Sequence, residues 1–102
     1  MEITINIQQD SKIFAQFSAT HSLEAPASIQ AIIVVDNAYN STKYSCTVGP
    51  PGAGIQFHNG HIEFLTTSLD AGLHTITIQF LRQSGEPTIL DRTLTVMEII
   101  SQ

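Results

Sequence analysis

A chain of 102 residues is about the size of one domain, and its 42% hydrophobic and 13% charged residues are typical of a folded globular protein rather than a disordered one. Nine acidic against four basic residues give a formal net charge of −5, the wrong sign for binding nucleic acid or an anionic membrane surface. The longest apolar run, Ala31 to Val35, is far too short for a membrane-spanning helix, so we expect no membrane insertion.

The sequence does not specify the cellular localisation. The first ten residues carry Glu2 and alternating polarity where a secretory signal carries positive charge and a continuous apolar block, so we expect no signal peptide. Cys46 is the only cysteine, which excludes an intramolecular disulfide and leans towards a reducing compartment. Its neighbours Tyr44 and Val48 predict that its side chain is buried. The localisation stays unknown, between the cytoplasm and an excised domain of a surface protein.

Alternation of apolar and polar residues predicts a succession of β-strands and no helix. Turn-forming segments rich in Gly, Pro, Asn, Asp and Ser separate the strands. One of these is GPPGAG, residues 49–54, a Pro-Gly turn without the lysine of a phosphate-binding loop. In chain order the residues expected to face the core are Ile3, Ile5 and Ile7; Ile13, Ala15, Phe17 and Ala19; Ile29, Ala31, Ile33 and Val35; Tyr44, Cys46 and Val48; Ile55 and Phe57; Ile62 and Phe64; Ile76, Ile78 and Phe80; and Leu94 and Val96.

The segment from Ile29 to Val35 is apolar on both faces of its predicted strand. One interpretation is a central strand whose outer face is shielded by neighbouring side chains. The other is a binding surface for a partner, formed by Ile32 and Val34. A similar ambiguity recurs near the C-terminus, because Met97 and Ile99 fall on the face opposite the core unless a bulge shifts the register.

The segment FHNGHIEF, residues 57–64, contains the dipeptide Asn59-Gly60, which favours a two-residue hairpin turn. Such a turn would pair His58 with His61 on the outer face, with Glu63 beside them. Two imidazoles and a carboxylate could hold a transition metal, although a plain exposed hairpin with polar outward residues is the favoured interpretation. The same register turns four residues to the core: Ile55, Phe57, Ile62 and Phe64.

The loop DNAYN, residues 36–40, offers two further candidate contacts. Asp36, Asn37 and Asn40 supply oxygen atoms for calcium, but one carboxylate is too few to hold the ion well. Tyr39 is a candidate exposed anchor for a protein or sugar partner. His21 is expected to be a solvated loop residue without a site of its own.

The segment from Leu69 to Val96 begins with Asp70-Ala71-Gly72 and then places His74 and Ile76 two residues apart. This pattern resembles the last two strands of bacterial immunoglobulin-like domains, with His74 at the place of the corner tyrosine. The resemblance implies a single immunoglobulin-like antiparallel β-sandwich of seven or eight strands over residues 1–102. It also implies that His74 is a partly buried, hydrogen-bonded imidazole that fixes the preceding loop. It implies no particular function, because this fold hosts unrelated activities.

The sequence lacks the marks of an enzyme. The acidic residues fall mostly in turns or at outward positions, and no Gly-x-Ser-x-Gly nucleophile motif occurs. We therefore expect a non-enzymatic binding or assembly module without a cofactor, whose partner is a protein, including a second copy in a homo-oligomer, or else a carbohydrate. A structural domain of a virion or surface appendage is the alternative, and a small metal-binding protein using His58 and His61 is the least favoured.

Overall fold

The computed structural model describes residues 1–24, 27–41, 43–48, 55–85 and 87–100, so the GPPGAG segment lies outside the described residues. Within these residues the chain is all-β, as predicted, and contains no helix that could cross a membrane. The strands are β1 (Glu2–Ile7), β2 (Lys12–Glu24), β3 (Ala27–Val35), β4 (Tyr39–Asn40), β5 (Tyr44–Val48), β6 (Ile55–Leu65), β7 (Gly72–Ser84) and β8 (Thr88–Ile99).

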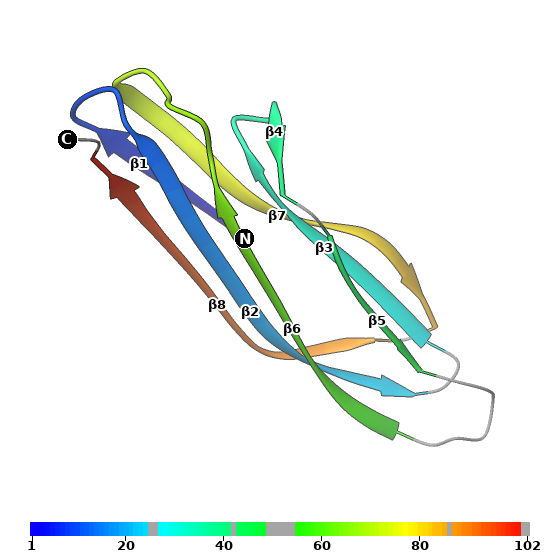
Figure 1. The fold of residues 1–102 in the computed structure, drawn as a ribbon. Coiled ribbons are helices and arrows are strands. Elements are labelled where there is room, and N and C mark those ends of the chain that lie inside the picture. The colour runs from blue at the N-terminus through cyan, green and yellow to red at the C-terminus, as the bar shows by residue number, and fades with distance from the viewer. Residues whose placement is uncertain (25–26, 42, 49–54, 86, 101–102) are drawn as a thin grey trace.

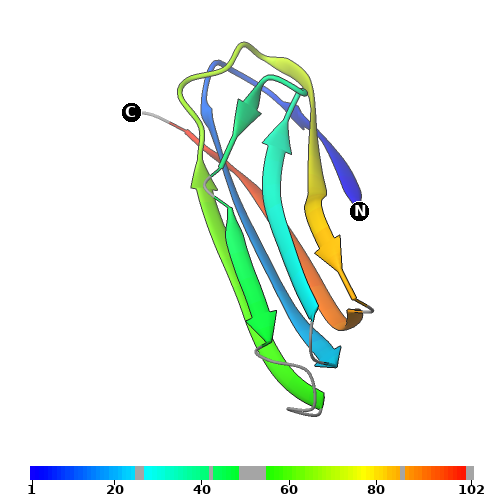
Figure 2. The same cartoon turned by 90° about the vertical axis from the view of Figure 1, so that its right-hand side faces the viewer.

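The strands form two antiparallel sheets that face each other across a shared core (Figures 1 and 2). The three-stranded sheet has the order β6-β2-β8, with β2 in the centre. The five-stranded sheet has the order β1-β7-β3, and β4 and β5 both pair with β3. The molecule is elongated, with extents of 53 × 20 × 19 Å. The first of these strands, β1, lies in the five-stranded sheet, and the last, β8, lies in the three-stranded sheet.

The core follows the predicted alternation along most strands. Ile13, Ala15 and Phe17 of β2 are fully buried, and they meet Ile33 of β3 and Ile76 of β7 from the opposite sheet. A second, smaller cluster lies towards the end of the molecule where β2 ends and β3 begins; its buried members are Leu23, Ala27, Ile29 and Cys46. Removing these side chains from water is the main driving force for packing the sheets together.

The central-strand interpretation of β3 agrees with the structure. Ile32 and Val34 point away from the core but are each only 7% exposed, because β3 lies between β7 on one side and β4 and β5 on the other. At the C-terminus, by contrast, Met97 and Ile99 are exposed. The register shift between β2 and β8 occurs at Thr20/His21, too far away to turn them inward.

The predicted hairpin at Asn59-Gly60 is wrong, because β6 runs through both residues without a turn. It pairs with β2 continuously from Phe14↔Leu65 to Glu24↔Ile55. Gly60 is needed for close packing: a Cβ atom there would lie 2.3 Å from Cε1 of Tyr44. The glycine that suggested a turn is thus a contact position for a ring of the opposite sheet.

The straight path of β6 reverses part of the predicted core face. Ile55 and Phe57 are 60% and 67% exposed rather than buried, whereas Ile62 is buried and Phe64 is partly buried as expected. Side chains alternate between the two faces of a strand. Phe57 and Ile62 are an odd number of residues apart, so they share a face only if a turn lies between them. Without it, Phe57 moves to the outer face and His58 to the inner one.

Candidate functional site

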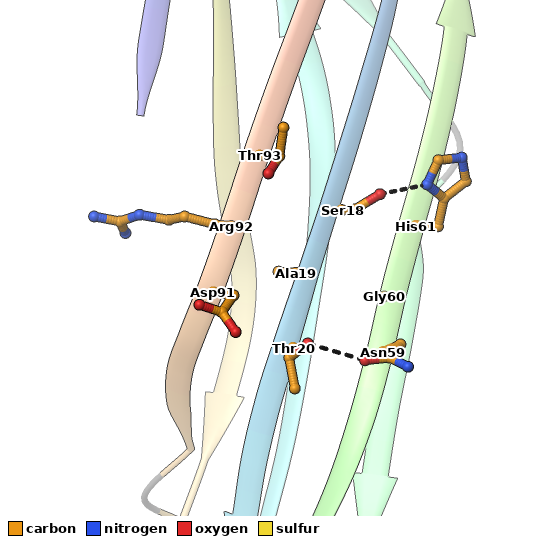
Figure 3. Close-up of a pocket in the computed structure, with 9 residues that line it drawn as sticks. All are labelled: Ser18, Ala19, Thr20, Asn59, Gly60, His61, Asp91, Arg92 and Thr93. Carbon is orange, nitrogen blue, oxygen red and sulfur yellow. Dashed lines mark hydrogen bonds between the residues drawn. The ribbon is translucent and has the colours of Figure 1, made fainter.

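The outer face of the three-stranded sheet carries a polar hollow with a volume of about 340 Å³ (Figure 3). Cross-strand pairing sets two rows of polar side chains along its sides, and a third row of residues lies between them. The first row is His61, Ser18 and Thr93; the second is Asn59, Thr20 and Asp91; the residues between them are Gly60, Ala19 and Arg92. The hollow exists because short side chains leave the space above the strands unfilled.

Hydrogen bonds fix several of these groups. Ser18 Oγ lies 2.6 Å from His61 Nδ1, and His61 Nε2 lies 3.1 Å from Glu63 Oε1. With the ring proton on Nε2, the imidazole accepts from the serine hydroxyl and donates to the carboxylate. Thr20 donates to Asn59 Oδ1 at 3.0 Å. The side chains on the β2–β6 part of the hollow are therefore ordered.

The Ser18–His61–Glu63 line has the order of a nucleophile, a base and an orienting acid. Its surroundings do not suit nucleophilic catalysis, because the side chains of His61 and Glu63 are 50% and 55% exposed to water. Stabilising an oxyanion also requires donors in a water-excluded site. Ser18 lies on the central strand, where backbone groups bond to β6 and β8. The line presents hydrogen-bonding groups on the outer face of the sheet.

On the β8 side two charged residues, Asp91 and Arg92, border the hollow. Asp91 and Arg92 form no ion pair within the part of the chain that the structure describes. Figure 3 shows the Arg92 side chain extending sideways from β8, away from the other lining residues. These two groups are free to contact an incoming molecule.

Apolar side chains flank the hollow at both ends of the same face. Phe14 pairs with Leu65 on one side and Met97 on the other, so that three apolar side chains cross the sheet in one row. Leu65 and Met97 are exposed, as is Ile99 in the next row. At the other end, Phe57 and Ile55 are the exposed pair. We call this surface, with the polar hollow in its middle, the β6-β2-β8 face.

The three predicted metal ligands are not brought together. His61 and Glu63 lie side by side on the outer face, whereas His58 is on the inner face, opposite His21. Residues 58 and 61 are an odd number apart, so a continuous strand sends them to opposite faces. No group of three or more His, Cys, Asp or Glu side chains arranged to hold a metal occurs among the described residues.

His21 is a functional candidate that the sequence interpretation missed. The prediction of a solvated loop residue is wrong, because His21 lies on β2 and is fully buried between the two sheets. Its Nε2 lies 2.6 Å from the Tyr44 hydroxyl, and its Nδ1 has no hydrogen-bond partner in the part of the chain that the structure describes. Burial, and to a lesser extent the neighbouring His58, lower the pKa of His21. The missed signal was the alternation of β2, which continues from Ala19 through His21 to Leu23.

The prediction for His74 is confirmed. Its side chain is 12% exposed and hydrogen-bonded through both ring nitrogens, to Asp36 Oδ2 at 2.5 Å and to the Asp70 carbonyl at 2.7 Å. Both partners are acceptors, so only the doubly protonated imidazolium satisfies both bonds. The hydrogen bonds to Asp36 and then to Asp70 raise the pKa of His74. Thr75 N–H donates to the other Asp36 oxygen at 2.8 Å.

The remaining sequence candidates divide by exposure. Both carboxylate oxygens of Asp36 are used by β7, which leaves the predicted calcium loop without a free carboxylate. Of the three predicted binding residues, only Tyr39 on β4 is exposed, since Ile32 and Val34 are buried within the single chain. Tyr39 is therefore accessible to a partner, but it lies on the five-stranded sheet, away from the hollow.

No family model, curated protein or solved structure matches this chain. The surfaces described above are the basis for the function proposed next.

Proposed function

We propose that the protein is a non-enzymatic binding and assembly module that associates with a second copy of itself through the β6-β2-β8 face. The observation that carries this proposal is the presence of exposed apolar side chains at both ends of one sheet face. Leu65, Met97 and Ile99 lie at one end, and Ile55 and Phe57 lie at the other. Exposed apolar patches mark interaction sites on soluble proteins.

The placement of charge on this face suits a second copy. The chain carries −5 overall, so two copies repel through most of their surfaces. The face holds Lys12 at one end and Glu24 at the other, with Glu63 and Asp91 between them, whereas Arg92 pairs with the inward-facing Ala19. If the second copy is reversed end to end, Lys12 of one copy lies over the Glu24 end of the other. Opposite charges then offset part of the repulsion.

The dimensions indicate a reversible contact. Eleven paired residues at about 3.4 Å each, across three strands about 4.8 Å apart, give a footprint of roughly 500 Å² per copy. Two copies would bury about 1,000 Å², the lower limit of a specific interface. A twofold axis through the hollow would place the Phe14 end of one copy over the Phe57 end of the other. We expect association in the micromolar range or weaker.

We also propose that the fold is immunoglobulin-like, with its terminal strands exchanged between sheets. The pairing of β2 with β6, opposite the pairing of β3 with β7, supports this assignment, because immunoglobulin domains pair strands B with E and C with F. In those domains the first strand lies in the sheet of B and the last in the sheet of F. Here β1 pairs with β7 and β8 pairs with β2.

Sedimentation velocity over micromolar to millimolar concentrations tests self-association. We expect the parent chain to move towards dimer or larger species, and Phe14→Glu/Met97→Glu to stay monomeric at every concentration. Leu73→Glu is the matched control, since Leu73 is exposed on the other sheet. A parent chain that is monomeric throughout would sink the proposal, as would dispersal by the control variant alone. An open-ended series of species would favour the structural role in a virion or surface appendage over a closed dimer.

A carbohydrate is the second candidate partner, favoured by the hollow. Its hydroxyl, amide and carboxylate groups are the hydrogen-bonding types that sugars require, and Phe57, next to Asn59 on the same face, offers an exposed ring. A glycan array tests this candidate with the parent chain, Phe57→Ala and Asp91→Ala. Signal that both variants lose supports a sugar site in the hollow, and a blank array removes it.

A further inference from the structure

His21 lies at a junction between the two sheets. The residue belongs to β2 of the three-stranded sheet, whereas its hydrogen-bond partner Tyr44 belongs to β5 of the five-stranded sheet. The two rings also contact each other, with centroids 5.6 Å apart and planes tilted by 40°. The Tyr44 ring in turn stacks against Phe17 at 6.4 Å. One imidazole therefore connects the two layers by a polar contact inside the core.

The described surroundings of His21 contain no counter-ion. The ionisable groups beside it are His58 from β6 and Tyr44 from β5, and Cys46 lies next to Tyr44 in the smaller cluster. At the paired position β8 contributes the apolar Ile89, and the nearby inward residues of β3 are apolar. Glu24 and Asp91 are the nearest carboxylates along the paired strands, and both are exposed at the outer surface. Among the described residues, each group around the imidazole is neutral or basic.

Protonation would place an isolated charge at this position. An imidazolium has two N–H donors. The Tyr44 oxygen can accept from one of them, but Nδ1 is buried without a hydrogen-bond partner among the described residues, and the other titratable ring beside it, His58, is basic. A buried charge without a counter-ion or full hydrogen bonding is strongly destabilising. The folded sandwich must exclude that proton or separate to hydrate it.

We propose that His21 is an acid-sensitive latch, whose protonation separates β2 from β5 and opens the end of the sandwich that contains Leu23, Ala27, Ile29 and Cys46. This end depends on the smaller core cluster, which has few members to compensate for a hydrated charge. The larger cluster around Phe17, Ile33 and Ile76 holds the other part of the two sheets together independently.

The sign of the effect follows from the lowered pKa of His21. The unfolded chain has the ordinary value of 6.5 and binds the proton first as the pH falls. The contribution of His21 to stability is therefore complete above pH 6.5 and is lost as the pH falls from there through the folded-state pKa. In that window the folding equilibrium constant drops about tenfold per pH unit for this one proton.

Denaturant unfolding of the full chain at pH about 7.5 and about 5.5 tests the latch, because a histidine changes charge between these values. His58→Glu places a carboxylate opposite His21, so we expect the loss of folding equilibrium constant on acidification to shrink by about tenfold relative to the parent. His58→Gln is the matched control, because it places an uncharged amide of the same size at the same position, and it should keep the parent's acid loss. Equal acid losses in the parent and His58→Glu would overturn the proposal.

A second variant guards against misfolding at the buried position. His21→Leu/Tyr44→Phe removes both hydrogen-bonding partners together, which leaves no polar group behind. We expect it to fold and to show the reduced acid sensitivity of His58→Glu, and an undiminished acid loss would count against the latch. Native-state hydrogen exchange of the parent then locates the opening. Amides of β5 and of the end of β2 should lose protection at acid pH before those of Ile76 and Ile78, and a uniform loss would refute the local opening.

Discussion

Gly60 of β6 lies against the ring of Tyr44 on β5, so closely that any side chain at this position would occupy the space of the ring. The contact joins strands of different sheets. It also explains why an Asn-Gly pair, which elsewhere makes a turn, lies here in the middle of an eleven-residue strand. The backbone at Gly60 does not adopt a positive φ.

Replacing Gly60 by alanine should therefore destabilise the protein through overpacking. We expect a loss of about 1–3 kcal/mol in the free energy of unfolding, measured by denaturant titration. The control is the same substitution in a Tyr44→Leu background, where the ring is absent and the additional penalty should fall by at least half. If Gly60→Ala costs the same with and without the ring, the contact is not the reason for the glycine.

The register of β6 predicts opposite consequences for two phenylalanines that alternation alone places in the core. Phe17 is fully buried and stacks near Tyr44 and Phe80, so Phe17→Ala should cost about 3–5 kcal/mol. Phe57 is on the outer face, so Phe57→Ala should change stability by no more than about 0.5 kcal/mol. Thermal and denaturant unfolding compare the two. A large loss in the free energy of unfolding of Phe57→Ala would support the hairpin register instead.

His74 should make stability depend on pH in the direction opposite to His21. Its hydrogen bonds to Asp36 and Asp70 raise its pKa, so its contribution is complete below 6.5 and is lost as the pH rises through the folded-state value. Relative to His74→Asn, the parent should thus be more stable at pH about 5.5 than at pH about 8.5. Asp36→Asn should remove most of this difference, and an unchanged profile in Asp36→Asn would assign the effect to another group.

The Ser18–His61–Glu63 line should not act as a catalytic triad. With an activated ester such as p-nitrophenyl acetate, we expect the parent and Ser18→Ala to hydrolyse the substrate at rates within about twofold of each other, because the groups are half exposed to water. His61→Ala distinguishes simple imidazole catalysis from a serine mechanism. A fall of about 100-fold or more in Ser18→Ala is the size expected for a real catalytic group and would make the protein an esterase.

Alternation was sufficient to predict the all-β class and most of the inward residues, because half-buried strands expose one face and bury the other. It was also sufficient at β3 and β7, and along β2 as far as Ala19. It failed at β6, where the local turn preference of Asn59-Gly60 competed with a long-range contact to Tyr44 that no local pattern records. The predicted metal ligands His58 and His61 lie on opposite faces for the same reason, since their pairing depended on the turn.

The two histidines with distinct environments show a second limit of local interpretation. His74 follows a turn signal in the same segment, which predicts its hydrogen bond to the Asp70 carbonyl but not the one to Asp36, 38 residues away. The role of His21 depends on Tyr44, which is 23 residues away and in the other sheet. The hollow likewise depends on the register among β6, β2 and β8, which only the assembled sheet defines.

The placement of β1 and β8 in different sheets has a consequence for how the chain folds. Lys12 of β2 pairs with Ile99 of β8, and Glu2 of β1 pairs with Thr77 of β7, so neither sheet is complete until distant parts of the chain have met. Closing such long loops costs entropy before the contacts compensate for it, and folding of this type takes milliseconds to seconds. During synthesis on a ribosome, β2 emerges well before β8, so one edge of β2 stays unpaired until β8 has been made.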